Sequence, residues 1–162
     1  MAFDPSEFRR IMGHWVSGVA VVTSRKPGGE PCGLTATAIT SLSLEPPLVL
    51  VCIDRMADSH ECIHRAGVFV VNVLEQSAEP LARRFAAADI ADKFAGIAHR
   101  AAPSGAPILE SALAWIDCRL QHTVAGGDHT IFIGEVGAGD GREGVPLLHY
   151  RGEYRRLPGG LR

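Results

Sequence analysis

The sequence predicts a mainly β protein, an antiparallel barrel or sandwich with a few covering helices. Strand-like segments outnumber helical segments, and most of them are joined by turns of hairpin length. Eighteen of the 162 residues are glycine, mostly in turn-like positions, which favours a fold with many corners. Strands joined in this way pair antiparallel, whereas a parallel sheet would need helices between them. No linker or repeat divides the chain, so we expect one domain over residues 1–162.

The composition is that of an ordinary globular domain, with 46% apolar residues, 21% charged residues and a formal net charge of -2. The basic residues are scattered along the chain, which does not predict a nucleic-acid partner. The longest apolar run, Leu48–Ile53, is too short to cross a bilayer. We therefore expect neither a nucleic acid nor a membrane among the partners.

The start of the chain carries acidic Asp4 and Glu7 and no apolar segment of the kind found in secretory signals. We therefore expect a cytoplasmic location. The four cysteines stand at positions 32, 52, 62 and 118 and form no C-x-x-C pair. In a reducing cytoplasm, this spacing predicts free thiols.

The first element is a predicted helix. Asp4 is suited to the N-cap and Pro5 to the first helical position, and Glu7 completes a capping-box-like pattern. Phe3 and Phe8 occupy the two positions of a hydrophobic staple. Apolar residues then recur at helical spacing, which predicts that one face packs on another element. These residues are Phe8, Ile11, Met12 and Trp15.

Alternating strands and helices follow. Val16–Thr23 is strand-like, and the turn Pro27–Gly29 joins it to a second strand over Cys32–Ser43. Leu48–Ile53 is apolar on both faces and predicts a buried strand. Asp58–Arg65 reads as a short helix, with Asp58 and Glu61 at capping-box spacing. The remaining elements are a strand at Val68–Leu74, a helix at Ser77–Phe94, a loop at 96–107, strands at Leu113–Val124 and His129–Val136, a turn region at Gly137–Gly144, and short strands at Leu147–Tyr150 and Glu153–Arg155.

The segment Cys32–Ser43 is crowded with small and hydroxylated residues where strands usually carry Val and Ile. Such side chains bury less surface than Val or Ile would. They leave hydroxyl groups and backbone accessible to a flat polar ligand. The strand pattern alone favours an exposed edge strand with a polar face. Both readings stay open on the residues themselves.

Three local patterns suggest chemistry. His60-Glu61-x-x-His64 matches the zinc-binding H-E-x-x-H pattern, but the helix is short and no third ligand follows at a typical spacing. Ser59 starts the predicted helix, where backbone N–H groups suit a phosphate, although simple capping explains it as well. Arg84 and Phe85 suit a phosphate clamp, or a solvated arginine beside a core phenylalanine.

Longer motifs carry a resemblance to a known family. Phe8–Thr23, Gly33–Ser43 and Pro46–Leu48 resemble the corresponding segments of the flavin reductase-like family, the short reductase components of two-component flavin-dependent monooxygenases. The match continues through Asn72–Leu74, Arg84–Phe85, Asp92–Phe94, Gly127–His129, Phe132–Glu135 and Leu148–Gly152. It covers about Phe8 to Tyr154.

The resemblance implies a fold and a set of site residues. The fold is an FMN-binding split β-barrel with an antiparallel Greek-key core, assembled as a homodimer with flavin near the interface. The implied flavin-ring wall is Thr35, Ala36 and Thr37, continued by Ser41, Leu42 and Ser43. Asp54 to Ser59 would approach the ribityl chain and phosphate, and Arg84 and Phe85 would close over the phosphate or adenylate. The implied nicotinamide site is His129, as the catalytic residue, with His149, Tyr150, Arg151 and Gly152.

The implied activity is an NAD(P)H:flavin oxidoreductase. Hydride would pass from the nicotinamide to FMN or FAD, and the reduced flavin would leave for a separate monooxygenase. The residues do not choose between FMN and FAD or between NADH and NADPH. Two alternatives stay open: a non-catalytic flavin-binding protein on the same barrel, and a zinc hydrolase using His60, Glu61 and His64.

Overall fold

A computed structural model describes residues 3–157 and shows a mainly β chain. The helices are α1 (Pro5–Met12), α2 (Asp58–Ala66), α3 (Glu79–Ala86) and the short 3-10 helix η1 (Gln76–Ala78). The strands are β1 (Ser17–Gly18), β2 (Ala20–Arg25), β3 (Pro31–Ala36), β4 (Ile39–Leu44), β5 (Pro47–Asp54), β6 (Val68–Leu74), β7 (His99–Ala101), β8 (Pro107–Leu109), β9 (Ala112–Gly126), β10 (His129–Gly141), β11 (Leu148–Tyr150) and β12 (Glu153–Arg155). The predicted class, mainly β with a few helices, is confirmed.

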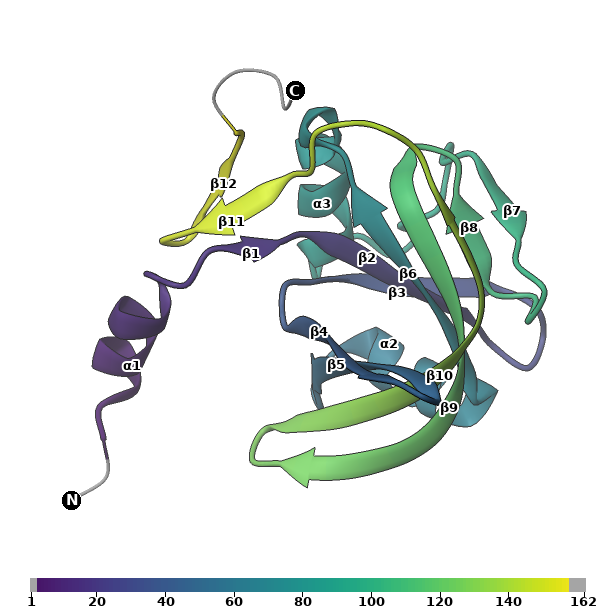
Figure 1. Cartoon of the computed structure of the whole chain (residues 1–162), viewed down its shortest axis with the longest axis horizontal. Helices are drawn as coiled ribbons and strands as arrows, with labels where there is room; N and C mark the ends of the chain where they lie inside the picture. The colour runs from purple at the N-terminus through teal and green to yellow at the C-terminus, as the bar shows by residue number, and fades with distance from the viewer. Residues whose placement is uncertain (1–2, 158–162) are drawn as a thin grey trace.

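One seven-stranded antiparallel sheet forms the body of the molecule. Its strand order is β3-β2-β6-β9-β10-β5-β4. The sheet curls strongly, and its two edge strands, β3 and β4, are joined by the short link Thr37–Ala38 (Figure 1). Register shifts in β10 after Ile133 and after Val136 interrupt the pairing with β9. Bulges of this kind bend a strand and increase its twist, so they favour the curl.

Smaller elements surround this sheet. Strands β1, β11 and β12 form a separate three-stranded sheet, and β7 pairs with β8. Helix α2 packs on β2, β3 and β6, and α3 packs on β2 and β3. Helix α1 stands apart from the curled sheet (Figure 1). No helix among residues 3–157 is long and apolar enough to cross a membrane.

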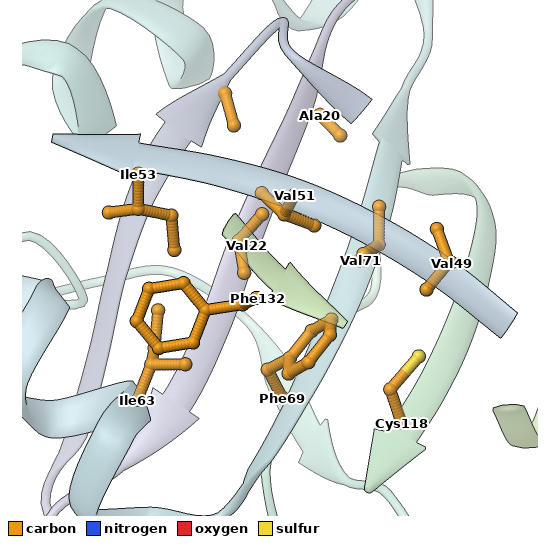
Figure 2. Packing of buried hydrophobic residues seen from close by; sticks show 11 residues of the cluster. Ala20, Val22, Val49, Val51, Ile53, Ile63, Phe69, Val71, Cys118 and Phe132 are labelled. Atoms are coloured by element: carbon orange, nitrogen blue, oxygen red, sulfur yellow. The ribbon is translucent and has the colours of Figure 1, made fainter. Parts of the chain in front are cut away.

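The main core lies inside the curled sheet. Figure 2 shows Ile63 of α2, Phe69 of β6 and Phe132 of β10 pointing into the same space. Gly134 makes this packing possible, because a Cβ at that position would lie 2.5 Å from Cζ of Phe69. A second cluster around Phe85 joins α3 to β2, β6 and β8.

A buried polar group ties the second cluster to the sheet. The side-chain amide of Asn72 donates to the carbonyl oxygen of Val21 at 3.1 Å and to the hydroxyl of Thr23 at 3.0 Å. Its carbonyl oxygen accepts from the backbone N–H of Leu109 at 2.8 Å. The hydroxyl of Thr23 in turn donates to the carbonyl oxygen of Pro107. Because Asn72 lies on β6 and its partners lie on β2 and β8, this network fixes β8 against β2 and β6.

The structure corrects several predicted boundaries. Cys32–Ser43 forms two strands, β3 and β4, since the chain turns at Thr37 and Ala38 from one edge of the sheet to the other. The helix predicted over Ser77–Phe94 ends at Ala86, and Phe94 packs back on Phe85 from a loop, with ring centroids 5.0 Å apart. The region Gly137–Gly144 is mostly strand, because β10 continues pairing with β9 as far as Gly141.

The helix starts agree only in part with their predicted caps. Asp4 caps α1 as predicted, accepting from the N–H of Ser6 at 2.9 Å. Glu7 bonds instead to Arg10, at 2.6 Å and 2.7 Å. The N-cap of α2 is Ala57, which offers no side-chain acceptor, so the predicted capping box there is wrong.

The cysteine prediction is wrong for two of the four residues. Cys32 of β3 and Cys62 of α2 form a disulfide, with their Cα atoms 6.7 Å apart. They are separated by 30 positions in the sequence, so the pairing depends on the contact between β3 and α2. Cys52 and Cys118 are free.

Candidate functional site

One candidate site is a cleft of about 620 Å³ between α1, the start of β4 and the C-terminal strands. Thr37, Ala38 and Ile39 line one side of it. His149, Arg151 and Gly152 line the other side. A smaller hollow of about 350 Å³ adjoins it and shares Thr37 and Ile39 as lining residues. We call the two together the central cleft.

The backbone at Thr37 and Ala38 is left outside the strand pairing. The pairing of β3 with β2 ends at Ala36, and the pairing of β4 with β5 begins at Ile39. The carbonyl oxygen of Ala38 accepts from the N–H of Cys52 at 2.9 Å, which holds the link in place. Ala38 is exposed. A small side chain on an accessible backbone leaves room for a flat ligand.

The opposite wall is a tight turn between β11 and β12. Arg151 has φ 52° and Gly152 has φ 82°, both in the left-handed region. The N–H of Arg151 donates to the carbonyl oxygen of Gly13 at 3.0 Å, so the turn is attached to the end of α1. His149 pairs with Ser17 of β1 and lies edge-on to Tyr154, with ring centroids 5.8 Å apart. These contacts hold His149 at the cleft.

A second, smaller pocket of about 120 Å³ lies at the start of α2. Ser59 lines it and is 5% exposed. Lys26 and Lys93 also line it, together with Cys32 and Gly33 of β3. We call it the Ser59 pocket. Helix N–H groups and lysine side chains suit a phosphate, but Asp58 and Asp92 line the same pocket. The phosphate contact of Ser59 therefore stays a prediction.

His129 and Asp54 lie together at a third place. They are directly paired between β10 and β5. His129 Nδ1 lies 2.7 Å from an Asp128 carboxylate oxygen, and this hydrogen bond lowers the pKa of Asp128. Neither His129 nor Asp54 is among the residues that line the central cleft or the Ser59 pocket. Asp54 instead accepts from the backbone N–H groups of Met56 at 2.8 Å and Ala57 at 3.1 Å, before the start of α2.

Several predicted contact residues are engaged elsewhere. Ala36 is buried in the main core. The ring of Phe85 is fully buried, and a Cβ at Gly33 would lie 3.1 Å from it. Arg84 Nε and Nη2 donate to the carbonyl oxygens of Lys93 at 2.7 Å, Asp92 at 3.1 Å and Ala95 at 2.8 Å. Arg84 thus fastens the loop that carries Lys93, while Phe85 supports β3 from behind.

The later residues of β4, Ser41 to Ser43, and Tyr150 are not among the residues that line the central cleft. Ser41 and Leu42 are exposed on β4, and Ser43 is half-buried. Tyr150 is half-buried between the cleft residues His149 and Arg151. The predicted flavin contacts of these four residues are not tested by the geometry.

The H-E-x-x-H pattern has a structural explanation. His60 Nε2 lies 2.8 Å from the Thr130 hydroxyl. The rings of His60 and His64 stand edge-on to Phe132, at centroid distances of 5.2 Å and 6.5 Å. Among residues 3–157, no group of three or more His, Cys, Asp or Glu side chains could hold a metal ion. The zinc alternative finds no third ligand in the described part of the chain.

The geometry adds residues that the sequence reasoning missed. Ala38, Ile39 and Cys52 line the central cleft, and Lys26 and Lys93 line the Ser59 pocket. Ile39 and Lys93 stand inside motifs that already matched the family, so the motif positions could have identified them. Cys52 gives no such signal, because it reads as a core residue of a buried strand.

A model of the flavin reductase like domain matches residues 12–158. The chain belongs to the flavin reductase-like family. The resemblance carried by the motifs is thereby confirmed, and the zinc hydrolase alternative is set aside. The match covers both walls of the central cleft and the Ser59 pocket.

Relatives within the family agree with this assignment. The chain is 43% identical over 154 residues to the reductase subunit HsaB of a flavin-dependent monooxygenase from Rhodococcus jostii (strain RHA1), covering 94% of this chain and 78% of that one. It is also 43% identical over 154 residues to a flavin reductase from Pseudomonas putida, covering 94% and 90%. A solved structure of the NADH:FAD oxidoreductase SgcE6 from Streptomyces globisporus, in complex with NAD and FAD fragments, has a TM-score of 0.87 and 38% identity, covering 98% and 97%.

Proposed function

We propose that this protein is an NAD(P)H:flavin oxidoreductase that reduces FMN or FAD and supplies the reduced flavin to a separate monooxygenase. The central cleft carries the proposal, because it sets the accessible Thr37–Ala38 backbone opposite His149 and Arg151. Family relatives that are named as flavin reductases and as monooxygenase reductase subunits support it.

The residues present fit a flavin. A cleft of about 620 Å³ lies within the range of small-molecule sites, about 300–1,000 Å³. Strand β3 runs from the Ser59 pocket, at Cys32 and Gly33, to the cleft, at Thr37. The four residue-to-residue steps from Gly33 to Thr37 span about 13 Å, comparable to the reach of FMN from ring to phosphate. The proposal places the ring against Thr37–Ile39 and the phosphate at Ser59.

The chain contributes position and electrostatics. A bound flavin supplies the acceptor for the hydride of the nicotinamide donor. Thr37 and Ala38 present backbone and a small side chain to one face of the cleft, so a flat ring can lie close to them. His149 and Arg151 stand across the cleft, where a nicotinamide nucleotide would cover the other face. Lys26 and Lys93 would offset the phosphate charge.

Steady-state oxidation of NADH and NADPH with FMN, FAD and riboflavin tests this function. We expect oxidation that depends on added flavin, and a higher KM for riboflavin, which lacks the phosphate that Ser59 would bind. Absence of flavin-dependent oxidation with both donors contradicts the proposal. Flavin binding without turnover would instead indicate the non-catalytic flavin-binding alternative.

The catalytic role of His129 stays a prediction. His129 does not line the central cleft of its own chain. The variant His129→Asn tests whether this side chain contacts the nicotinamide. If His129 positions the donor, the variant lowers kcat/KM for NADH while the flavin Kd stays unchanged. Unchanged kcat/KM contradicts the assignment.

We further propose a homodimer. Helix α1 presents an apolar face that nothing in the described chain covers, with Phe8 57%, Ile11 46% and Trp15 75% exposed. Apolar surface of this extent favours a protein partner. Light scattering should give twice the chain mass, and Ile11→Glu should lower it toward the monomer. Met56→Glu, at a residue 88% exposed outside α1, serves as the control. A monomeric wild type contradicts the proposal.

The finer fold and the location are proposals as well. The curled antiparallel sheet supports the split β-barrel with a Greek-key core, and the family match over residues 12–158 supports one domain over residues 1–162. Dependence on a nicotinamide donor supports a cytoplasmic location.

A further inference from the structure

The Cys32–Cys62 disulfide joins the two sides of the Ser59 pocket. Cys32 lies on β3 and lines the pocket. Cys62 lies on α2, three residues after Ser59, which also lines it. The disulfide therefore determines how closely the start of α2 is held to β3.

The cross-link also closes a loop around the proposed flavin-ring wall. The two cysteines are 30 positions apart, and the segment between them includes the end of β3, the Thr37–Ala38 link, β4 and β5. A cross-link over a loop of this length restricts the conformations available to that segment. Helix α2 has nine residues and no side-chain N-cap bond. On the β10 side its first turn is held by His60, whose Nε2 lies 2.8 Å from the Thr130 hydroxyl, whereas the disulfide holds α2 on the β3 side.

The pocket gives a reductant access to one of the two sulfur atoms. The two cysteines are only 9% and 8% exposed, but Cys32 lines the Ser59 pocket whereas Cys62 does not. A small thiolate such as that of glutathione would attack Cys32 Sγ, forming a mixed disulfide and releasing the Cys62 thiolate. A second glutathione then yields the Cys32 thiol and glutathione disulfide. Two electrons and two protons pass from two small thiols to the protein.

We propose that this disulfide is a reversible redox latch on the flavin site, in which the cross-linked form binds flavin more tightly than the dithiol form. The inference rests on the proposed function. The cross-link holds Ser59 and β3 in the spacing that the phosphate and the ring require, so the flavin does not have to order them on binding. Disulfides in cytoplasmic proteins are usually transient and redox-sensing, which agrees with a reversible bond here.

Thermodynamic linkage requires flavin binding and disulfide formation to affect each other equally. If the disulfide favours flavin binding, bound flavin must favour the disulfide over the dithiol by the same factor. Coupling between two sites in one protein typically amounts to about fivefold or more. We therefore expect the flavin Kd to rise at least about fivefold on reduction, and the equilibrium with glutathione to shift equally when FMN is added.

The first experiment compares FMN affinity in the two states. The full chain is equilibrated with oxidised or with reduced glutathione, and FMN is titrated while its fluorescence is followed. A Kd at least about fivefold higher in the dithiol state supports the latch. Equal affinities, or tighter binding by the dithiol form, overturn the latch and leave the proposed function intact. Absence of flavin binding in both states overturns the proposed function itself, and the latch with it.

The second experiment measures the disulfide directly and does not depend on turnover. The protein is brought to equilibrium in glutathione buffers, with and without FMN, starting from the oxidised and from the reduced form. Free thiols are then alkylated and located by mass spectrometry. Because mass spectrometry locates each label, Cys32 and Cys62 are read separately from the free thiols Cys52 and Cys118.

The equilibrium position separates coupling from simple shielding. A flavin in the Ser59 pocket would also slow the attack on Cys32, but slowing leaves the final ratio of disulfide to dithiol unchanged. A ratio shifted by the same factor as the Kd supports the latch, and an unshifted ratio overturns it. In the double variant Cys32→Ser/Cys62→Ser the response of FMN affinity to glutathione must disappear, whereas in Cys118→Ala it must persist. If the double variant does not fold, the two wild-type measurements decide.

Discussion

The hydroxyl of Thr35 donates a hydrogen bond of 2.7 Å to the carbonyl oxygen of Ala82 in α3. The side chain that the family resemblance assigned to the flavin ring thus ties β3 to the helix behind it. The proposed ring wall therefore begins two residues later, at Thr37.

Thr35→Val tests this assignment. The variant keeps the shape of the side chain but loses the donor to Ala82, so we expect the free energy of unfolding to fall by about 1 kcal/mol. Denaturant unfolding measures this loss. The flavin Kd, from a fluorescence titration, should stay within twofold or so of wild type. An unchanged stability with strongly weakened flavin binding would instead place the hydroxyl on the flavin.

Ala38→Leu tests the cleft wall. Ala38 is exposed and lines the central cleft, so the added side chain should fill ligand space without disturbing the core. We expect flavin affinity to fall about tenfold or more, which corresponds to about 1.4 kcal/mol, with little change in unfolding.

Ala36→Leu is the matched control for that wall. Ala36 is 7% exposed and packs in the main core, so a larger side chain there should cost about 1–3 kcal/mol of stability. Thermal unfolding of both variants separates the two effects. If Ala36→Leu folds normally and loses flavin while Ala38→Leu keeps it, the wall lies at Ala36.

Asn72→Leu tests the buried polar network. The substitution removes partners from Val21 and Thr23 and leaves the N–H of Leu109 without an acceptor inside the protein. Leaving a buried donor unsatisfied costs about 1–3 kcal/mol, so we expect a loss of about 2–3 kcal/mol in urea unfolding. A loss well under about 1 kcal/mol would mean that β8 is held without this network.

His60 predicts a pH dependence of stability. Burial, followed by the nearby charge of His64, lowers the pKa of His60 in the folded state. The unfolded chain, with an ordinary histidine pKa of about 6.5, therefore binds the proton first as pH falls. The stabilisation is present above about pH 6.5 and is lost as pH falls through the folded pKa.

Urea unfolding between about pH 7 and about pH 5 measures this loss. His60→Gln should reduce the slope, and the same change at His122, exposed on β9, should not. Hydrogen bonds from Ser6 and Arg10 lower the pKa values of Asp4 and Glu7 below the ordinary carboxyl range, so these groups act below this window. An equal slope in His60→Gln and wild type contradicts the prediction.

Local chemistry was enough to predict much of the fold. Asp4 and Pro5 predicted the start of α1, and the turn before His129 predicted the long β9–β10 hairpin, because caps and tight turns depend on a few adjacent residues. The motifs then led to the family, and with it to Thr37, Ser59 and His149 as site residues.

The parts of the fold that local patterns did not predict depend on contacts between segments that are distant in the sequence. The predicted helix beyond Ala86 fails because Arg84 bonds to carbonyl oxygens of residues 92, 93 and 95, which fold back as a loop. Phe94 makes an apolar contact as predicted, but it packs on Phe85 from that loop and not from a helix.

The sequence by itself determined the mainly β class, the hairpins and the family, since each follows from neighbouring residues or from motifs in a fixed order. Tertiary structure alone decided which side chains face the cleft. It turned Thr35 toward Ala82, buried Ala36 and Phe85, and left the Thr37–Ala38 link open. It also joined Cys32 to Cys62 across 30 positions. The physical reason is that orientation and pairing depend on how the curled sheet and its helices pack, which no local pattern encodes.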